Sequence, residues 1–141
     1  MPRWERSIDI QATPEAVWAV LADIEGWPGW TPSIISAERV DAGLLARDSE
    51  ARVQPRGTPK SLWKVSEVTP NRSFTWGTRV RGAQTTAGHT ITPTADGSRV
   101  TLTLEVGGVA AKLLRPIISR PIVANLNDEA EGLKRATESR A

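Results

Sequence analysis

The 141-residue sequence has no cysteine and no tyrosine, and it has a single histidine and a single phenylalanine. Without cysteine the chain can form neither disulfides nor thiolate metal sites. One histidine is too few for most zinc and non-haem iron sites, which combine several imidazole and carboxylate ligands. We therefore expect no metal site and no cofactor.

Long hydrophobic runs are missing as well. No apolar stretch approaches the roughly 20 residues that a membrane-spanning helix needs, and residues 1–5 do not have the character of a signal peptide. We expect a soluble, cytoplasmic protein. A chain of 141 residues predicts one domain, 1–141, built around one hydrophobic core.

The excess of positive charge is small, because the sequence has 18 lysines and arginines and 16 acidic residues, for a net charge of +2. Nucleic-acid binding by charge needs clustered basic residues with few acids between them, so we expect no nucleic-acid partner. One stretch does cluster its cations: residues 109–127 contain Lys112, Arg115 and Arg120 and no carboxylate. This stretch favours transient contact with a membrane surface or a phosphate-bearing ligand. The sequence leaves monomer and homodimer open.

Periodicity predicts one strand, a short helical region, six further strands and a long helix. The first strand covers 6–10, and Thr13 and Pro14 predict the N-cap and first residue of a helix that ends near Gly26. Further strands are expected at 34–40, 46–54, 61–68, 73–80, 84–94 and up to Val106. Their short connections predict an antiparallel sheet. The helical segment from Val109 to Thr137 contains Pro116 and Pro121, so we expect a kink or two pieces.

The segment Trp27-Pro28-Gly29-Trp30 places two indole rings on a turn between the helical region and the strands. The proline and glycine favour a turn and do not continue a helix. Rings held in this way suit the wall or lid of an apolar cavity. The alternative is that they fill one end of the core.

The order of these elements resembles the START-like helix-grip proteins, and more closely the polyketide cyclase/dehydrase-type branch of the SRPBCC superfamily. The segments that carry the resemblance are 12–18, 27–32, 63–65 with Pro70, 74–76, 88–100 and 133–135. The resemblance implies an α+β helix-grip fold, in which a seven-stranded antiparallel sheet curls around a long C-terminal helix and two short helices follow the first strand. It also implies a deep cavity between sheet and helix that holds an apolar, aromatic or polyketide-like molecule.

The candidate ligand-binding residues follow from this cavity and from the apolar stripe of the last helix. We expect its mouth near the Trp27–Trp30 turn and the start of the C-terminal helix. The candidates are Trp27, Trp30, Trp63, Trp76, His89, Ile91, Leu114, Ile117 and Ile118. For Trp63 and Trp76, lining a cavity and filling it remain alternatives.

His89 and Glu67 are the candidate catalytic residues. His89 has the same strand parity as Ile91 and should face the core, where an imidazole with a pKa near ~6.5 can act as an acid or a base. Glu67 has the parity of Trp63 and could orient His89, or it could be solvated. The absence of tyrosine and of a second histidine deprives a base of common partners. We therefore interpret the protein first as a noncatalytic binder or carrier. The alternatives are a metal-free cyclase or dehydratase that uses His89, and lipid transfer at a membrane through residues 109–123.

Overall fold

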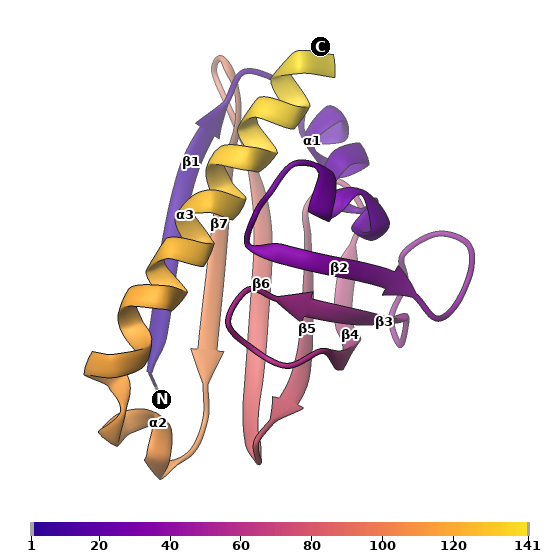
Figure 1. The fold of residues 1–141 in the computed structure, drawn as a ribbon. Coiled ribbons are helices and arrows are strands. Elements are labelled where there is room, and N and C mark those ends of the chain that lie inside the picture. The colour runs from indigo at the N-terminus through magenta and orange to yellow at the C-terminus, as the bar shows by residue number, and fades with distance from the viewer. Residues whose placement is uncertain (1, 141) are drawn as a thin grey trace.

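A seven-stranded sheet forms the centre of the computed structural model, which describes residues 2–140 (Figure 1). The strands are β1 (Arg3–Ile10), β2 (Ile34–Arg39), β3 (Glu50–Pro55), β4 (Ser61–Thr69), β5 (Ser73–Val80), β6 (Ala83–Thr94) and β7 (Gly97–Val106). They lie in the order β1-β7-β6-β5-β4-β3-β2, and every neighbouring pair is antiparallel. The predicted seven-stranded antiparallel α+β fold is confirmed.

The sheet is strongly curled. Figure 1 shows β2 and β3 turned across the face on which the long C-terminal helix lies. The register shifts between Ile34 and Ser36 in β2 and between Val65 and Glu67 in β4. Such bulges add a residue to one strand, bend it and increase its twist. The curled sheet and the helix therefore enclose a common interior, as in a helix-grip fold.

Two short helices connect β1 to β2. In α1 (Pro14–Leu21), the Thr13 hydroxyl accepts a hydrogen bond from the amide of Ala16 at 3.2 Å, which confirms the predicted N-cap. The helix ends at Leu21 and not near Gly26, because residues Ile24–Gly29 form a separate 3₁₀ helix, η1. Pro28 lies inside η1. In a continued α-helix its ring would clash with the carbonyl four residues earlier.

The C-terminal helical segment has two pieces, as predicted: α2 (Val109–Leu113) and α3 (Arg115–Arg140). The break falls at Leu114, ahead of Pro116, which occupies the first turn of α3 where a missing N–H costs little. Pro121 lies inside α3 without dividing it. No helix among residues 2–140 is both long enough and apolar enough to cross a membrane.

The second half of α3 covers the interior by packing on β1, β7 and α1. Its buried residues are Leu126, Ala130, Gly132, Leu133 and Thr137. At Gly132 a side chain is excluded, because a Cβ there would overlap the backbone carbonyl of Trp30. The helix therefore lies directly against the turn that carries the two indole rings.

Candidate functional site

An aromatic cluster occupies the interior between the sheet and α3. It consists of Trp27, Trp63, Phe74, Trp76 and His89, all of them buried. The ring centroids of Trp27 and Trp76 are 5.4 Å apart, as are those of Trp63 and Trp76. The His89 imidazole stacks on Phe74 at 4.1 Å with an interplanar angle of 13°. Strand pairing accounts for this stack, because Phe74 on β5 lies directly opposite His89 on β6.

His89 has a polar neighbour near each of its ring nitrogens. Its side chain is 3 % exposed, and its Nδ1 lies 3.2 Å from the backbone carbonyl oxygen of Phe74. A carbonyl oxygen only accepts hydrogen bonds, so Nδ1 carries the hydrogen and donates it. The other ring nitrogen, Nε2, lies 3.8 Å from Oε1 of Glu129. This distance is too long for a direct hydrogen bond, and it leaves Nε2 able to engage a further group.

Glu129 comes from α3 and was not a sequence candidate. A signal for it exists in the helical spacing, because Leu126, Glu129, Ala130 and Leu133 occupy positions i, i+3, i+4 and i+7. This is the spacing of a buried stripe. A carboxylate within such a stripe faces the interior, and here it faces the only histidine of the sequence.

The parity argument that placed Glu67 beside Trp63 is wrong. Val65 pairs with Trp76, but Glu67 pairs with Thr75, because the bulge inserts Ser66 between them. The extra residue reverses the alternation of inward and outward side chains beyond it. The side chain of Glu67 is therefore exposed, on the outside of the sheet, which agrees with the solvated alternative. The carboxylate beside His89 is that of Glu129.

The other predicted residues divide into two groups. One group belongs to the core: five residues are buried, namely Trp27, Trp63, Trp76, His89 and Ile91, and two pack against them, Trp30 and Ile118. The other group, Leu114 and Ile117, is exposed. The expected mouth near both the Trp27–Trp30 turn and the start of the helix is also wrong. Trp30 meets α3 at Gly132, 17 residues after Arg115, and at the rise of an α-helix those positions are about 25 Å apart.

The surface of the protein has two recesses near the elements described above. One, of about 740 Å³, lies between η1 and the last turns of α3 and is lined by Trp30, Pro32, Arg135 and Arg140, among others. The other, of about 470 Å³, lies on the outer face of β4 to β6. Neither is lined by Trp63, Trp76 or His89. In the region where the family resemblance implies a deep cavity, the rings of the aromatic cluster lie against one another, with centroid distances of 4.1–5.4 Å between His89 and Phe74, Trp27 and Trp76, and Trp63 and Trp76.

The polar atoms in and beside the cluster differ in whether they have a hydrogen-bond partner. Nε1 of Trp27 donates to the carbonyl of Leu21 at 2.9 Å, and the Thr78 hydroxyl donates to the carbonyl of Leu62 at 2.7 Å. Nε1 of Trp63 is buried and has no acceptor among the described residues. An unpaired buried donor costs about 1–3 kcal/mol. Trp63 therefore has an unpaired hydrogen-bond donor in an apolar interior.

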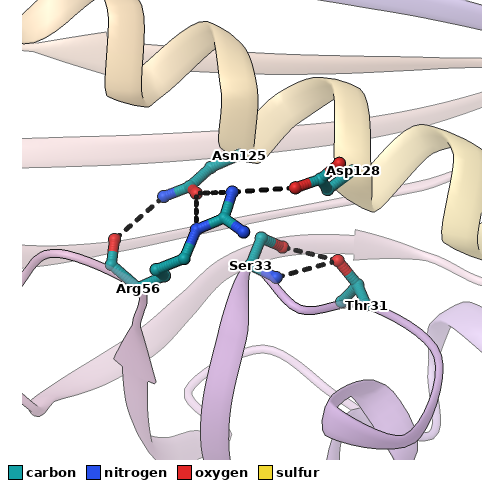
Figure 2. A network of polar contacts seen from close by, with 5 residues as sticks. All are labelled: Thr31, Ser33, Arg56, Asn125 and Asp128. Carbon is teal, nitrogen blue, oxygen red and sulfur yellow. Dashed lines mark hydrogen bonds and ion pairs between the residues drawn. The ribbon is translucent and has the colours of Figure 1, made fainter.

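A polar contact ties the loop after β3 to the middle of α3 (Figure 2). Nε and Nη2 of Arg56 donate to Oδ1 of Asn125 at 3.1 and 2.8 Å, and Nη2 donates to Asp128 at 2.8 Å. The Asn125 amide donates back to the carbonyl of Arg56 at 3.1 Å. We call this the Arg56 clasp. It links the curled edge of the sheet to the helix that covers the interior.

Beside the clasp lie two buried hydroxyls, Thr31 and Ser33, whose oxygens are 2.7 Å apart (Figure 2). The backbone amide of Arg56 donates to the carbonyl of Ser33 at 2.8 Å. The clasp therefore continues into the segment that follows the Trp27–Trp30 turn.

Solved structures share the whole architecture. The protein TTHA0849 of Thermus thermophilus aligns with a TM-score of 0.81 and 20 % identity, over 99 % of both chains. The hypothetical protein jhp0584 of Helicobacter pylori aligns with a TM-score of 0.79 and 13 % identity, over 96 % of this chain and 86 % of that one. BexL, described as a di-domain ARO/CYC from the BE-7585A biosynthetic pathway, gives a TM-score of 0.77 and 18 % identity, over 98 % of this chain and 47 % of BexL.

At such identities these structures establish the fold alone. No curated protein sequence matches the chain. The sequence itself does match one family, described as polyketide cyclase / dehydrase and lipid transport, over residues 1–138. The chain is a member of this polyketide cyclase/dehydrase family of the SRPBCC type.

Proposed function

We propose that the protein binds a hydrophobic, aromatic or polyketide-like small molecule within the aromatic cluster. The observation that carries the proposal is the buried Nε1 of Trp63, which has no acceptor among the described residues. A ligand with a carbonyl or phenolic oxygen would supply that acceptor. Desolvated pockets with a few placed polar groups are the usual form of small-molecule sites.

The arrangement of rings indicates the shape of the ligand. Trp76 lies between Trp63 and His89, with centroid distances of 5.4 and 6.3 Å. A planar ligand stacked near Trp76 would have the Trp63 donor at one edge and Nε2 of His89 at the other. Oxygen atoms at opposite edges of an aromatic framework match these two groups.

Access to the cluster requires a change from the closed arrangement seen here, because Trp63, Trp76 and His89 are buried. The Arg56 clasp joins the sheet edge to α3 through side chains that are 41 and 36 % exposed in the Arg56–Asp128 pair. Partly solvated pairs of this kind are weak. Opening at the clasp would therefore cost less than separating α3 from β1 through its buried stripe.

A matched pair of probes tests the proposal. 1-Acetonaphthone and 1-isopropenylnaphthalene share the ring system and the number of heavy atoms, but only the ketone has a carbonyl oxygen as acceptor. We expect wild-type protein to bind the ketone on the order of tenfold more tightly, since pairing a buried donor contributes about 1–3 kcal/mol. Titration calorimetry of Trp63→Phe should show this preference lost.

Trp27→Phe is the control variant. It removes an indole from the same cluster, but one whose N–H already donates to Leu21. It should weaken both probes together and keep the preference for the ketone. A Trp63→Phe protein that still prefers the ketone, or a wild type that binds neither probe saturably, would refute the proposed site.

A second candidate function, a metal-free cyclase or dehydratase, is favoured by the His89–Glu129 pair. The carbonyl of Phe74 fixes the ring of His89, and the Glu129 carboxylate can stabilise the imidazolium that forms when Nε2 takes a proton. The sequence offered Glu67 as a possible partner for His89, and in the structure the carboxylate near Nε2 belongs to Glu129. The bond from Nδ1 to Phe74 satisfies the requirement that a base be oriented by a hydrogen bond, and the Glu129 carboxylate adds a negative charge near Nε2.

Dehydration of 4-hydroxy-4-phenyl-2-butanone, followed by absorbance of the conjugated enone, separates the two functions. For a binder we expect no enzyme-dependent rate, and His89→Ala should alter ligand preference more than any turnover. A wild-type rate with a bell-shaped pH profile that His89→Gln abolishes and Glu129→Gln reduces would establish the enzyme instead.

A further inference from the structure

The elbow between α2 and α3 exposes four aliphatic side chains: Val109, Leu113, Leu114 and Ile117. Leu113 and Ile117 are 76 and 71 % exposed. We call these four residues the apolar elbow. Single exposed aliphatic residues are ordinary, but a contiguous group on one protruding feature marks an interaction surface.

The fold explains why the elbow protrudes. Gly108 has a φ of 103° and Leu114 interrupts the helix, so α2 leaves the sheet at an angle and buries only Ala111. In the first turns of α3 the core is already covered by Ile118 and Ile122, which pack against it. The elbow residues are therefore additional apolar side chains that the core does not use.

Positive charge surrounds the elbow. Lys112, Arg115 and Arg120 lie within or beside it, and residues 106–127 contain no acidic side chain. Arg115 stacks over the ring of Trp4 at 5.4 Å, which fixes one of these charges next to the end of β1. The nearest acidic residue along the chain, Glu105, pairs with Arg3 at 3.4 Å, and Arg3 also pairs with Glu5 at 3.1 Å.

The turn between β5 and β6 adds two more cations to the same end of the molecule. The amide of Gly107, just before α2, donates to the carbonyl of Gln84 at 2.8 Å, which joins the two features. Arg79, near the end of β5, and Arg81, in the turn, are exposed, and residues 68–95 contain no acid. Figure 1 shows the elbow and this turn at the same lower end of the fold.

We propose that the apolar elbow and its surrounding cations dock onto an anionic membrane surface. Aliphatic side chains at a protruding apex can enter the headgroup region while lysine and arginine contact anionic lipids, the combination found in interfacial segments. A second copy of the chain fits less well, because a symmetric contact would bring the two sets of cations together. The surface lies outside the aromatic cluster, so the proposal stands whether or not that cluster binds a ligand.

Vesicle co-sedimentation of the full chain tests the proposal. The vesicles contain either phosphatidylcholine alone or equal amounts of phosphatidylcholine and phosphatidylglycerol. We expect binding to the mixed vesicles only, decreasing as salt is added. Leu113→Gln with Ile117→Gln should weaken binding about tenfold or more, because each removes buried apolar area from the interface.

Two control variants, Leu44→Gln and Arg47→Gln, change residues of the same type and similar exposure to those changed in the elbow. Leu44→Gln removes a leucine that is 92 % exposed in the loop between β2 and β3 and should leave binding unchanged. Lys112→Gln with Arg120→Gln should weaken binding to mixed vesicles several-fold, whereas Arg47→Gln, an exposed arginine of that same loop, should not.

Three outcomes would overturn the proposal. One is absence of binding to mixed vesicles at low salt, and another is binding that the elbow variants leave unchanged. In the third, the protein does not bind vesicles but forms a dimer or a complex with an acidic protein. Leu113→Gln then dissociates that dimer or complex.

Discussion

The two halves of the C-terminal helical segment differ in how they use their apolar residues. In the second half, Leu126, Ala130, Leu133 and Thr137 form one buried stripe with spacings of four, three and four. In the first half, Ile118 and Ile122 pack inward while Val109, Leu113 and Ile117 point outward. Helical periodicity therefore identifies the half that completes the core. The exposed apolar residues beyond that stripe lie in the half that we propose docks onto a membrane.

The polar contacts follow the same division. The second half is fastened to the end of β1 and to the turn after it, because Lys134 donates to the carbonyl of Asp9 at 2.9 Å and Glu138 accepts from the amide of Gln11 at 2.9 Å. The first half is held by Trp4, whose Nε1 donates to Ser119 at 3.1 Å. The Arg56 clasp, at Asn125 and Asp128, marks the boundary between the halves.

The largest difference should appear when one leucine is shortened in each half. Leu133 is fully buried, so Leu133→Ala should lower the free energy of unfolding by about 3 kcal/mol through lost transfer energy and a cavity. Leu113→Ala should change it by less than about 0.5 kcal/mol. Urea denaturation measures both. Equal losses would mean that the elbow packs against the protein and is not a free surface.

A smaller effect is expected at the boundary. Arg56→Met keeps the apolar stem but removes every hydrogen bond of the guanidinium in the clasp, and we expect about 1 kcal/mol of lost stability. Hydrogen exchange should accelerate in β3 and around Asn125, and 1-acetonaphthone should associate faster. Arg52→Met is the control, because its 3.9 Å pair with Glu38 lies within the sheet edge and does not reach α3. Unchanged exchange in Arg56→Met would show that the clasp does not hold the two elements together.

The sequence predicts most of the fold because alternation and helix signals act locally. Three local predictions agree with the structure: His89 and Ile91 both face the core, Thr13 is an N-cap, and the last helix is divided in two. Glu67 was misplaced because a bulge depends on pairing with another strand, which local alternation does not record. Glu129 was missed because its neighbour His89 is 40 residues away and meets it only after α3 folds over β6.

The prediction of where the cavity mouth lies was wrong for a related reason. Trp30 and the start of α3 were each recognised, but their distance depends on where along the helix the turn packs. Gly132 sets that position, because only a residue without a side chain lets α3 reach the carbonyl of Trp30. A glycine inside a helix carries this information, yet the sequence alone does not say which segment it touches.

The smallest expected effect concerns acid and the second half of α3. The pKa of Glu138 is held below its ordinary value of about 4.5, first because its carboxylate accepts from the Gln11 amide and then because Lys134 donates to it. A depressed pKa in the folded state contributes stability above the pKa of the unfolded chain. This contribution is lost as the pH falls through the folded-state value.

Wild type should therefore melt at a slightly higher temperature than Glu138→Gln near neutral pH, and the gap should close as the solution is acidified below about 4.5. Glu131→Gln is the control, because that carboxylate is exposed and lies 4.0 Å from Arg6, its one ion-pair partner among the described residues. The first half of the segment has no carboxylate between residues 106 and 127 that could add a similar dependence. A gap that persists in acid would mean that Glu138 stabilises the helix end through packing and not through its charge, and the polar fastening of the second half would then rest on Lys134 and Asp9.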